Sequence, residues 1–484
     1  MNDATKPGKI VEGVCFSTEH IYKKGDTEIP YICDAQEFIF LDEMEQPEAS
    51  FFLYSYLRQD VDRKETRPLI FNYGGGPGNS STPLSVWGPK MMDPSFKKCV
   101  GPYPEPIENR DWLIDVADII CMDPPGTGYG HIYQYDKRGK YWGMQPDAVA
   151  FTDIFKFWLT KYDRWYSPKY IAGISYGGLR TALLADLLCG GPYYSDQRQY
   201  THGIALNGAI LCSTALAFDA SNPNNLENAG IFSSTANSLA TYAAINWYWN
   251  PDGKPALQEF VQEAKQFAAN EYLRAQWLGT DMACDEREAF LNKLSYYSGL
   301  PAGLLATLPN YEIDPNMYAS TLLAHEGKRL SIYDGREALS SSDHLGFYED
   351  YADDPANSRA TFLLAPMVRK FYGDFLGIHL DREWIEVNFD ANFQWTWSSN
   401  RSMIQHLESA LRRNPNMYAL VYGGAFDLSA VSGANQYAIR HSGIDQSRVM
   451  IHDDPNCGHG AGLNPASAHE YAQSVRELIA KSTC

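Results

Sequence analysis

A serine stands at the centre of the pentapeptide Gly173-Ile174-Ser175-Tyr176-Gly177, which has the pattern Gly-x-Ser-x-Gly. A short apolar run, residues 169–173, precedes this serine, and leucines at helical spacing follow it as far as residue 188. A strand that reverses sharply into a helix exposes a serine hydroxyl at the turn, and small flanking residues permit the reversal. This context favours Ser175 as a nucleophile over a chance pentapeptide on a surface turn.

A serine nucleophile requires a histidine base and a carboxylate that orients the base. Asp427 follows the apolar run at 418–422, and His459 follows the run at 448–451. If both runs are parallel strands, the two residues lie in loops at the edge where the active sites of such sheets gather. The order serine, acid, histidine is that of α/β-hydrolases.

Other residues near the C-terminus compete for these two roles. His452 falls at the expected strand, and His469 falls on the expected last helix. Asp453 and Asp454 come after the last strand instead of the strand before it. Position along the chain therefore favours Asp427 and His459.

A glycine-rich loop, Gly74-Gly75-Gly76-Pro77-Gly78, follows the early apolar run at 68–73. Glycines let backbone N–H groups approach a developing oxyanion without interference from Cβ atoms. The alternatives are a phosphate-binding loop and a plain turn. Neither a Gly-Lys-Ser/Thr ending nor a Gly-x-Gly-x-x-Gly spacing is present, which argues against nucleotide binding.

Short apolar runs alternate with helical patterns up to about residue 212, as in a mostly parallel α/β sheet. From 213 to 400 the chain is helical in pattern with few strand signals, and the alternation then resumes. We expect one α/β core, formed by residues 1–212 and 401–484, that is interrupted by a large helical lid insertion at 213–400.

Composition excludes several classes of protein. The 484 residues include 59 acidic and 40 basic side chains, and a net charge of −19 disfavours nucleic acid or an anionic membrane as a partner. No apolar run approaches the roughly 20 residues of a membrane helix. The nine cysteines show no CxxC spacing, so neither a metal site nor a cofactor is expected. The N-terminus lacks the apolar region of a signal peptide, which predicts a cytoplasmic location; oligomeric state is not indicated.

Several blocks together resemble the serine carboxypeptidase family, peptidase family S10, in its microbial branch. The residues concerned match, in order, the family's GGPGxSS, DxPxGTGxS, GESYxG, D and GH blocks: 75–81, 123–129, 173–177, Asp427 and 458–459. The insertion is similar around 311–315 and 330–336, so the resemblance extends from about 30 to 481. It implies an α/β-hydrolase with a helical lid, a Ser175–Asp427–His459 triad, and an oxyanion hole formed by the N–H groups of Gly76 and Tyr176.

The predicted substrate-binding positions are Gly74, Gly75, Val86 and Ile174, and the chain departs from the family at three of them. Family members hold the terminal carboxylate of a peptide with an Asn before GGPG, a Glu before the next Gly-Pro and the Glu of GESY. Gly74, Val86 and Ile174 stand at these places. The resemblance therefore implies an intact catalytic triad and a dismantled carboxylate clamp.

Three functions are consistent with these residues. The first is a serine hydrolase that cleaves a peptide or ester bond through an acyl-enzyme. The second is an acyltransferase on the same frame, which passes an acyl donor's group to an alcohol or amine. The third, a non-catalytic binding protein, is disfavoured because all three triad positions carry competent residues.

Overall fold

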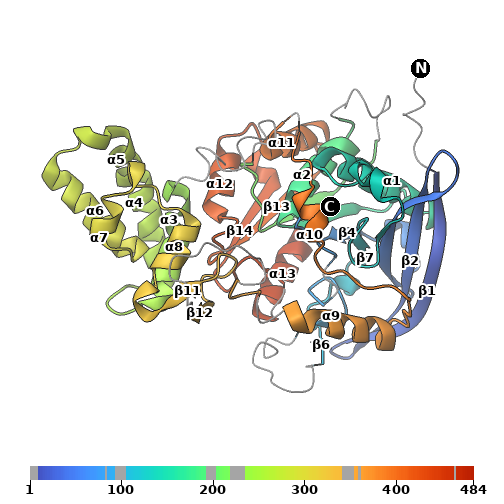
Figure 1. Ribbon diagram of the computed structural model, residues 1–484. Coiled ribbons are helices and arrows are strands. Elements are labelled where there is room, and N and C mark those ends of the chain that lie inside the picture. The colour runs from blue at the N-terminus through green and yellow to red at the C-terminus, as the bar shows by residue number, and fades with distance from the viewer. Residues whose placement is uncertain are drawn as a thin grey trace.

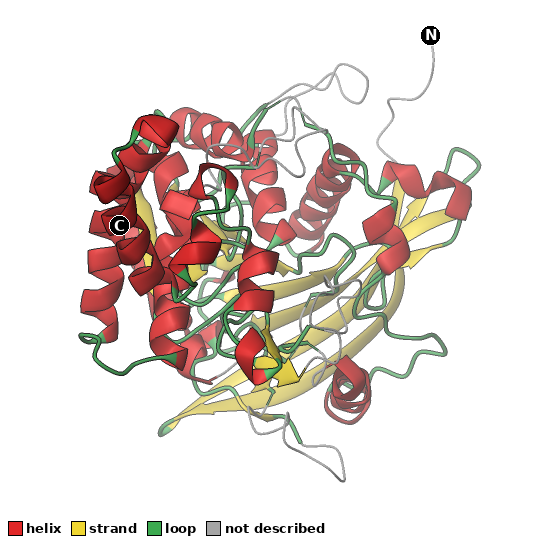
Figure 2. Ribbon diagram, turned by 60° about the vertical axis from the view of Figure 1, so that its left-hand side comes forward, coloured by secondary structure: helices red, strands yellow, loops and turns green. Residues whose placement is uncertain are grey.

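A computed structural model describes residues 9–81, 84–92, 105–191, 203–218, 235–340, 354–357, 361–399, 401–462 and 465–483. Its centre is a twisted sheet with helices on both faces (Figures 1 and 2). The strand order is β1-β2-β3-β7-β4-β9-β10-β13-β14, and β8 pairs with β3.

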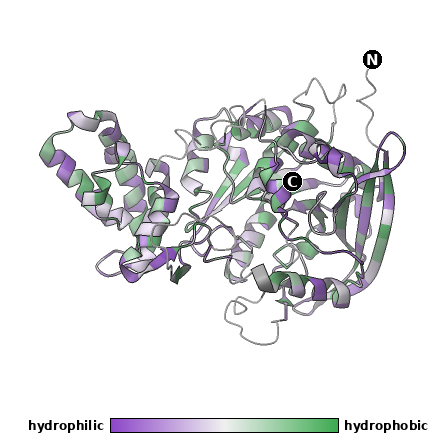
Figure 3. Ribbon diagram, viewed as in Figure 1, coloured by the Kyte–Doolittle hydropathy of each residue, from purple (hydrophilic) through white to green (hydrophobic). Residues whose placement is uncertain are grey.

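One side of the sheet is antiparallel. It consists of β1 (Lys9–Lys24), β2 (Thr27–Leu41), β3 (Pro47–Arg58) and the short β8 (His131–Ile132). Figure 3 shows hydrophilic and hydrophobic residues mixed along β1 and β2, as expected for strands with one face toward solvent.

The other side is parallel, and its central strands are buried on both faces. It consists of β7 (Asp118–Asp123), β4 (Leu69–Tyr73), β9 (Lys169–Ile174), β10 (Gly208–Cys212), β13 (Tyr418–Gly424) and β14 (Val449–Asp454). Every residue of β4, β7 and β10 is buried, which explains why these strands read as continuous apolar runs instead of alternating patterns.

Helices cover the two faces of the parallel side. One face packs against α1 (Met144–Lys161), α2 (Tyr176–Leu188), α11 (Met403–Arg413) and α12 (Ser432–Arg440). The opposite face packs against α13 (Pro465–Ser482) and the segment α9 (Thr361–Lys370) with the π-helix Phe371–Phe375. Two short antiparallel strands, β5 (Lys90–Met91) and β6 (Ile107–Glu108), lie outside the main sheet.

A separate helical unit projects beside α12 and β14 (Figure 1). Its elements are α3 (Thr235–Trp249), α4 (Leu257–Phe267), the π-helix Ala268–Tyr272, α5 (Leu273–Leu278), α6 (Cys284–Ser298), α7 (Ala302–Leu305), α8 (Pro315–Thr321), β11 (Lys328–Leu330) and β12 (Ala338–Ser340). These elements share a core of their own, which also takes in Phe426 and Leu428 on either side of Asp427.

The remainder of the expected insertion packs differently. Between α9 and Trp395, a stretch that includes α10 (Phe389–Phe393), the buried apolar side chains belong to the two cores on the faces of the central sheet. Within the expected 213–400 insertion, the described residues therefore divide between the separate unit and the central core. The boundaries given above for the lid remain a prediction.

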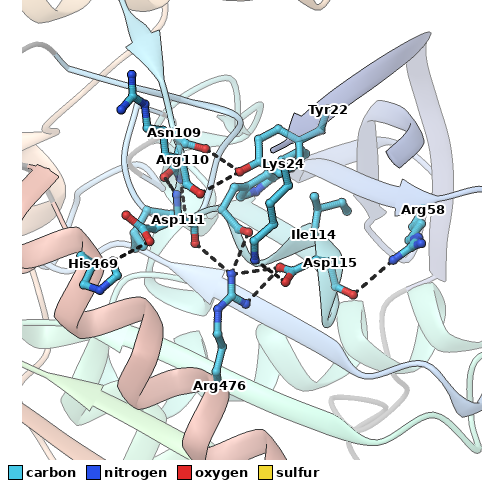
Figure 4. A network of polar contacts seen from close by, with 12 residues as sticks. Tyr22, Lys24, Arg58, Asn109, Arg110, Asp111, Ile114, Asp115, His469 and Arg476 are labelled. Carbon is cyan, nitrogen blue, oxygen red and sulfur yellow. Dashed lines mark hydrogen bonds and ion pairs between the residues drawn. The ribbon is translucent and has the colours of Figure 1, made fainter. Parts of the chain in front are cut away.

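A network of polar contacts ties the N-terminal strands to the last helix (Figure 4). Arg476 of α13 pairs with Asp115 at 3.0 Å and donates to the carbonyl oxygens of Asp111 and Trp112. Lys24 of β1 bonds to the same Asp115 at 2.5 Å, and Tyr22 donates to the carbonyl of Asn109. Helix α13 follows the loop of His459 in the sequence, so this network holds the helix that comes after that loop.

None of the helices within the described residues is long and apolar enough to cross a membrane.

A buried carboxylate at the start of β7 anchors the parallel side, and it supports a prediction about stability. Asp118 is 1% exposed and accepts hydrogen bonds from Arg67 and Arg164, each at 2.7 Å. Asp118→Ala leaves both buried guanidinium groups unpaired and should lower the free energy of unfolding by about 3–5 kcal/mol, as measured by urea denaturation. Asp60→Ala, which removes the exposed partner of Arg58, is the control and should change little. Equal effects of the two variants would contradict the structural role of Asp118.

Candidate active site

Ser175 occupies the turn between β9 and α2 with backbone angles φ 58° and ψ −125°. Non-glycine residues rarely adopt a positive φ, and such strain concentrates at functional turns. A Cβ atom on Gly173 would lie 2.1 Å from the carbonyl oxygen of Gly177, so the turn is too tight for a side chain there. The local sequence folds as the Gly-x-Ser-x-Gly pattern predicts, with the serine at the apex between strand and helix.

Asp427 and His459 lie in contact. The Nδ1 atom of His459 is 2.8 Å from Oδ2 of Asp427, whose side chain is fully buried. The other carboxylate oxygen accepts the backbone N–H groups of Ser429 and Ala430, each at 2.9 Å. A carboxylate held in this way fixes the imidazole ring and leaves Nε2 as its basic nitrogen.

The parallel strands bring the three loops to one edge. The N–H of Ser175 donates to Cys212 at the end of β10, and that of Ser213 donates to Tyr422 of β13. The N–H of Ala425 donates to Asp454 at the end of β14. Because β9, β10, β13 and β14 end level with one another, the loops that carry Ser175, Asp427 and His459 leave the same edge of the sheet.

The rival residues are engaged elsewhere. His452 stacks on Tyr422 with ring centroids 4.8 Å apart, and His469 bonds to Asp111 on the surface at 2.8 Å. Asp453 accepts hydrogen bonds from Ser432 and Gln436 of α12, and Asp454 accepts one from Tyr422. Among these residues, the structure pairs His459 with Asp427 as the sequence predicts.

The glycine-rich loop lies against the nucleophile turn. A Cβ atom on Gly75 would lie 2.4 Å from the carbonyl oxygen of Ile174 and 2.9 Å from Cβ of Ser175. Gly76 has φ +98°, a conformation that glycine adopts without strain. This close approach places the backbone of the loop beside Ser175 and Tyr176. The donor roles of the Gly76 and Tyr176 N–H groups stay a prediction.

Of the four predicted substrate-binding positions, the three that differ from the family offer little polar surface. Gly74 packs against the backbone of Ser80: a Cβ atom on Gly74 would lie 2.0 Å from the carbonyl oxygen of Ser80. Val86 is 1% exposed and packs beneath Gly462 in the loop of His459. Ile174 is partly buried and packs against the core on the α13 face of the sheet.

A buried ion pair that the sequence analysis missed supports the glycine-rich loop. Arg180 of α2 is 1% exposed, pairs with Asp147 of α1 at 2.6 Å, and donates to the carbonyl oxygen of Gly74 at 2.9 Å. Its guanidinium group also lies 5.0 Å from the ring centroid of Tyr176. The available signal was an arginine within a mostly apolar helix, because a buried charge must have a partner.

Elsewhere in the core, a second serine contacts a histidine, and that histidine contacts an aspartate. Ser399 Oγ is 2.7 Å from Nε2 of His406, whose Nδ1 is 2.8 Å from Asp186. His406 and Asp186 are fully buried, and Arg401 and Arg413 also bond to Asp186. We interpret this cluster as a structural link between α2 and α11, since it offers a substrate no access.

The segment that covers the glycine-rich loop carries an acid in an unusual environment. Glu386 accepts the N–H of Ser80 through its carbonyl oxygen, and its neighbours Ile385 and Val387 bridge to Gly128 and Asn79. Burial raises the pKa of the Glu386 carboxyl from its usual 4.5 to about 7. This group therefore holds a proton over much of the acidic range.

The contact between His459 and Asp427 supports a first prediction for the site. His459→Ala should lower the turnover of a chromogenic ester nearly as much as Ser175→Ala, because triad members act as a unit. Asp427→Asn should lower it by up to ~10⁴, since the amide stabilises the wrong imidazole tautomer. His469→Ala is the matched control and should keep full turnover. Near-normal turnover in either triad variant would transfer the role to His452 or Asp453.

The raised pKa of Glu386 supports a prediction about pH. The folded-state pKa exceeds the unfolded value, so this group's contribution to stability is complete below about pH 4.5 and is lost as pH rises through about 7. Glu386→Gln removes this dependence. Between pH 4.5 and pH 8, the free energy of unfolding of the variant should therefore rise by on the order of 1–2 kcal/mol relative to that of the original chain. This value includes a reduction for the partial exposure of the carboxyl.

Urea denaturation at several pH values measures this difference. Glu383→Gln changes an exposed acid on the same segment and serves as the control. Parallel pH profiles for Glu386→Gln and the original chain would contradict the assignment.

Comparison with known proteins agrees with this geometry. The family model for serine carboxypeptidases, Peptidase_S10, matches residues 35–456. The matched range contains Ser175 and Asp427 but ends before His459, so the place of His459 rests on its contact with Asp427. A search of curated protein sequences gives no match.

Several solved structures align with this chain at low sequence identity. The prohormone-processing carboxypeptidase Kex1Δp from Saccharomyces cerevisiae aligns with 14% identity and a TM-score of 0.51, over 96% of this chain and 90% of that one. A proline iminopeptidase from Mycobacterium smegmatis aligns with 15% identity, over 96% and 99% of the two chains, at a TM-score of 0.36. Homoserine O-acetyltransferase from Bacillus anthracis aligns with 13% identity, over 98% and 99% of the two chains, at a TM-score of 0.36.

The predicted α/β-hydrolase fold is confirmed by the carboxypeptidase structure and by the mostly parallel sheet. The family model covers most of the chain and includes the nucleophile turn and the acid. The chain therefore belongs to the serine carboxypeptidase family, S10, and is a serine hydrolase of that type.

Proposed function

We propose that this enzyme cleaves its substrate through an acyl-enzyme on Ser175, with His459 as the base and Asp427 as its orienting acid. The observation that carries the proposal is the 2.8 Å contact between His459 and Asp427 at the sheet edge where the strained Ser175 also stands. A hydroxyl at this turn becomes a nucleophile only when a base takes its proton during attack.

The proposed steps use groups that the chain itself supplies. Ser175 Oγ attacks the substrate carbonyl carbon while His459 Nε2 takes the hydroxyl proton. The N–H groups of Gly76 and Tyr176 stabilise the oxyanion, and His459 then donates its proton to the leaving group. Water, activated by His459, attacks the acyl-enzyme and releases the acid.

We further propose that the enzyme has lost the carboxylate clamp of its family. At Gly74 the backbone of Ser80 leaves no room for a side chain, and Val86 is buried beneath Gly462. Ile174 presents an alkyl group next to the nucleophile. A free carboxylate that enters such a site exchanges its hydration for no charge-assisted hydrogen bond from these positions, which is unfavourable.

A second candidate keeps the exopeptidase specificity through a different acid. Glu386 lies on the segment paired with the glycine-rich loop, and burial raises its pKa to about 7. A carboxyl that holds its proton in this range can donate a hydrogen bond to a substrate carboxylate. This candidate predicts a preference for free acids that Glu386→Gln would reduce.

Ser175 should be the single serine that a fluorophosphonate labels. Intact-mass analysis should show one adduct, and Ser175→Ala should abolish it, because Ser175 stands at a strained turn on the sheet edge that also carries the proposed base, His459. Ser399→Ala is the control and should keep the adduct. It is a demanding control because Ser399 also lies within hydrogen-bond distance of a histidine, His406. Retained labelling of Ser175→Ala, or its loss in Ser399→Ala, would refute the assignment.

The loss of the clamp predicts a preference for uncharged substrates. An acyl-amino acid should be processed no better than its methyl ester or primary amide, because each lost charge-assisted hydrogen bond costs about 1.5–3 kcal/mol. Values of kcat/KM for the three matched compounds measure the preference. A strong preference for the free acid would favour the Glu386 candidate instead.

A restored acid offers a matched test of the same prediction. Ile174→Glu returns the family residue beside the nucleophile, and Ile174→Gln provides an uncharged side chain of similar size. We expect Ile174→Glu to raise activity toward the free acid relative to the ester at acidic pH, where the new carboxyl is protonated. If the ratio of free-acid activity to ester activity is the same in the two variants, residue 174 does not determine the preference.

The acyltransferase alternative uses the same acyl-enzyme with another acceptor. Adding an alcohol or amine acceptor during turnover and measuring the ratio of transferred to hydrolysed product distinguishes the two reactions. A transferred fraction that saturates with acceptor would indicate an acceptor site and favour the transferase.

A further inference from the structure

The segment Ser331–Arg336, here called the strap, connects the separate helical unit with the loops of Asp427 and His459. It leaves β11 and reaches across both loops before β12 begins. Three backbone hydrogen bonds join it to them. Gly335 donates to the carbonyl oxygen of Phe426 at 2.9 Å, Leu428 donates to Ile332 at 3.0 Å, and His459 donates to Tyr333 at 2.6 Å.

Two of these bonds involve the residues on either side of Asp427, and the third involves His459 itself. Phe426 and Leu428 are the neighbours of Asp427 on either side, so the strap fixes the backbone from which the carboxylate extends. The ring of Tyr333 also lies 5.3 Å from the ring of His459. A Cβ atom on Gly458 would come within 2.4 Å of the carbonyl oxygen of Tyr333, so the contact requires glycine before the histidine.

Arg336 joins the strap to the loop that carries His459. Its guanidinium group makes a two-point ion pair with Asp334, at 2.9 and 2.7 Å, and donates to the carbonyl oxygen of Asn456 at 2.9 Å. It also lies over the ring of Phe426, 4.6 Å from the centroid. One side chain thus spans both catalytic loops, which a planar guanidinium with several donors can do and a lysine cannot.

The strap is itself held from the helical unit and from a buried acid. Trp249 of α3 donates to the carbonyl oxygen of Gly335 at 2.7 Å. Asp354, which is 1% exposed, accepts hydrogen bonds from the Ser331 hydroxyl at 2.6 Å and the Ile332 N–H at 3.0 Å. Displacement of the helical unit would therefore pull on the loops of both catalytic residues.

We propose that the strap is a positioning element of the active site and that Arg336 is its positioning residue, holding His459 and Asp427 in register through Asn456 and Phe426. This inference rests on the proposed function of the His459–Asp427 pair. It gives the helical unit a role in the chemical step that is separate from any role in selecting the substrate.

The test compares Arg336→Gln, Arg336→Lys and the control Arg274→Gln in the full chain. Arg274 lies in the same helical unit and pairs with the exposed Glu286. Fluorophosphonate labelling of Ser175 gives a maximal rate and an apparent affinity for the probe. The far-downfield NMR resonance of the proton between His459 and Asp427 reports their contact without any need for activity.

Arg336→Gln should lower the maximal labelling rate about 10–100-fold at nearly unchanged probe affinity, since small misplacements of reacting groups have effects of this size. It should also weaken or abolish the downfield resonance. Arg336→Lys should recover part of both signals, and Arg274→Gln should match the original chain.

An unchanged rate and resonance in folded Arg336→Gln would overturn the proposal, as would a loss confined to probe affinity or an equal loss in Arg274→Gln. If Arg336→Gln does not fold, the labelling rate and the resonance of Arg336→Lys test the proposal in its place. Lysine keeps the positive charge but cannot make the two-point ion pair with Asp334. Absence of labelling in the original chain would instead refute the proposed function, and the resonance would then test the strap alone.

Discussion

The candidate site depends on the close approach of two backbones, the glycine-rich loop after β4 and the nucleophile turn after β9. Gly75 lies so near Ser175 that even one methyl group would collide with it. Neighbouring parallel strands, joined by regular hydrogen bonds, bring these loops to the same edge, and the absence of side chains lets them meet. The bond from Arg180 to the carbonyl oxygen of Gly74 supports this approach from α2.

Buried charge is the second constraint on the structure. Asp427, Asp147, Asp118 and Asp186 lie in the interior, and each accepts hydrogen bonds from backbone N–H groups, arginine or histidine. An unpaired carboxylate at these places would be strongly destabilising, so the partners must fold together with the acids. Most of these clusters hold one element against another, whereas the pair of Asp427 with His459 lies at the sheet edge where the half-buried Ser175 stands.

The Ser399–His406–Asp186 cluster shows why residue types alone do not define a catalytic site. Its distances resemble those between His459 and Asp427, yet its histidine and acid are sealed in the core and two arginines share the acid. A nucleophile needs access and a strained, exposed hydroxyl in addition to a base. The strand-to-helix turn at Ser175 supplies that setting, and the same distances elsewhere do not.

The sequence alone determined the fold class and the three residues proposed for the triad, because glycines, apolar strands and chain order are local signals. It could not show that Gly74 lacks room for a side chain, that Arg180 bonds to the glycine-rich loop, or that the strap contacts the loops of both Asp427 and His459. It also could not show that residues from α9 onward pack on the central sheet instead of with the helical unit. These features depend on contacts between segments far apart in the chain, and only the tertiary structure decides which buried group meets which partner.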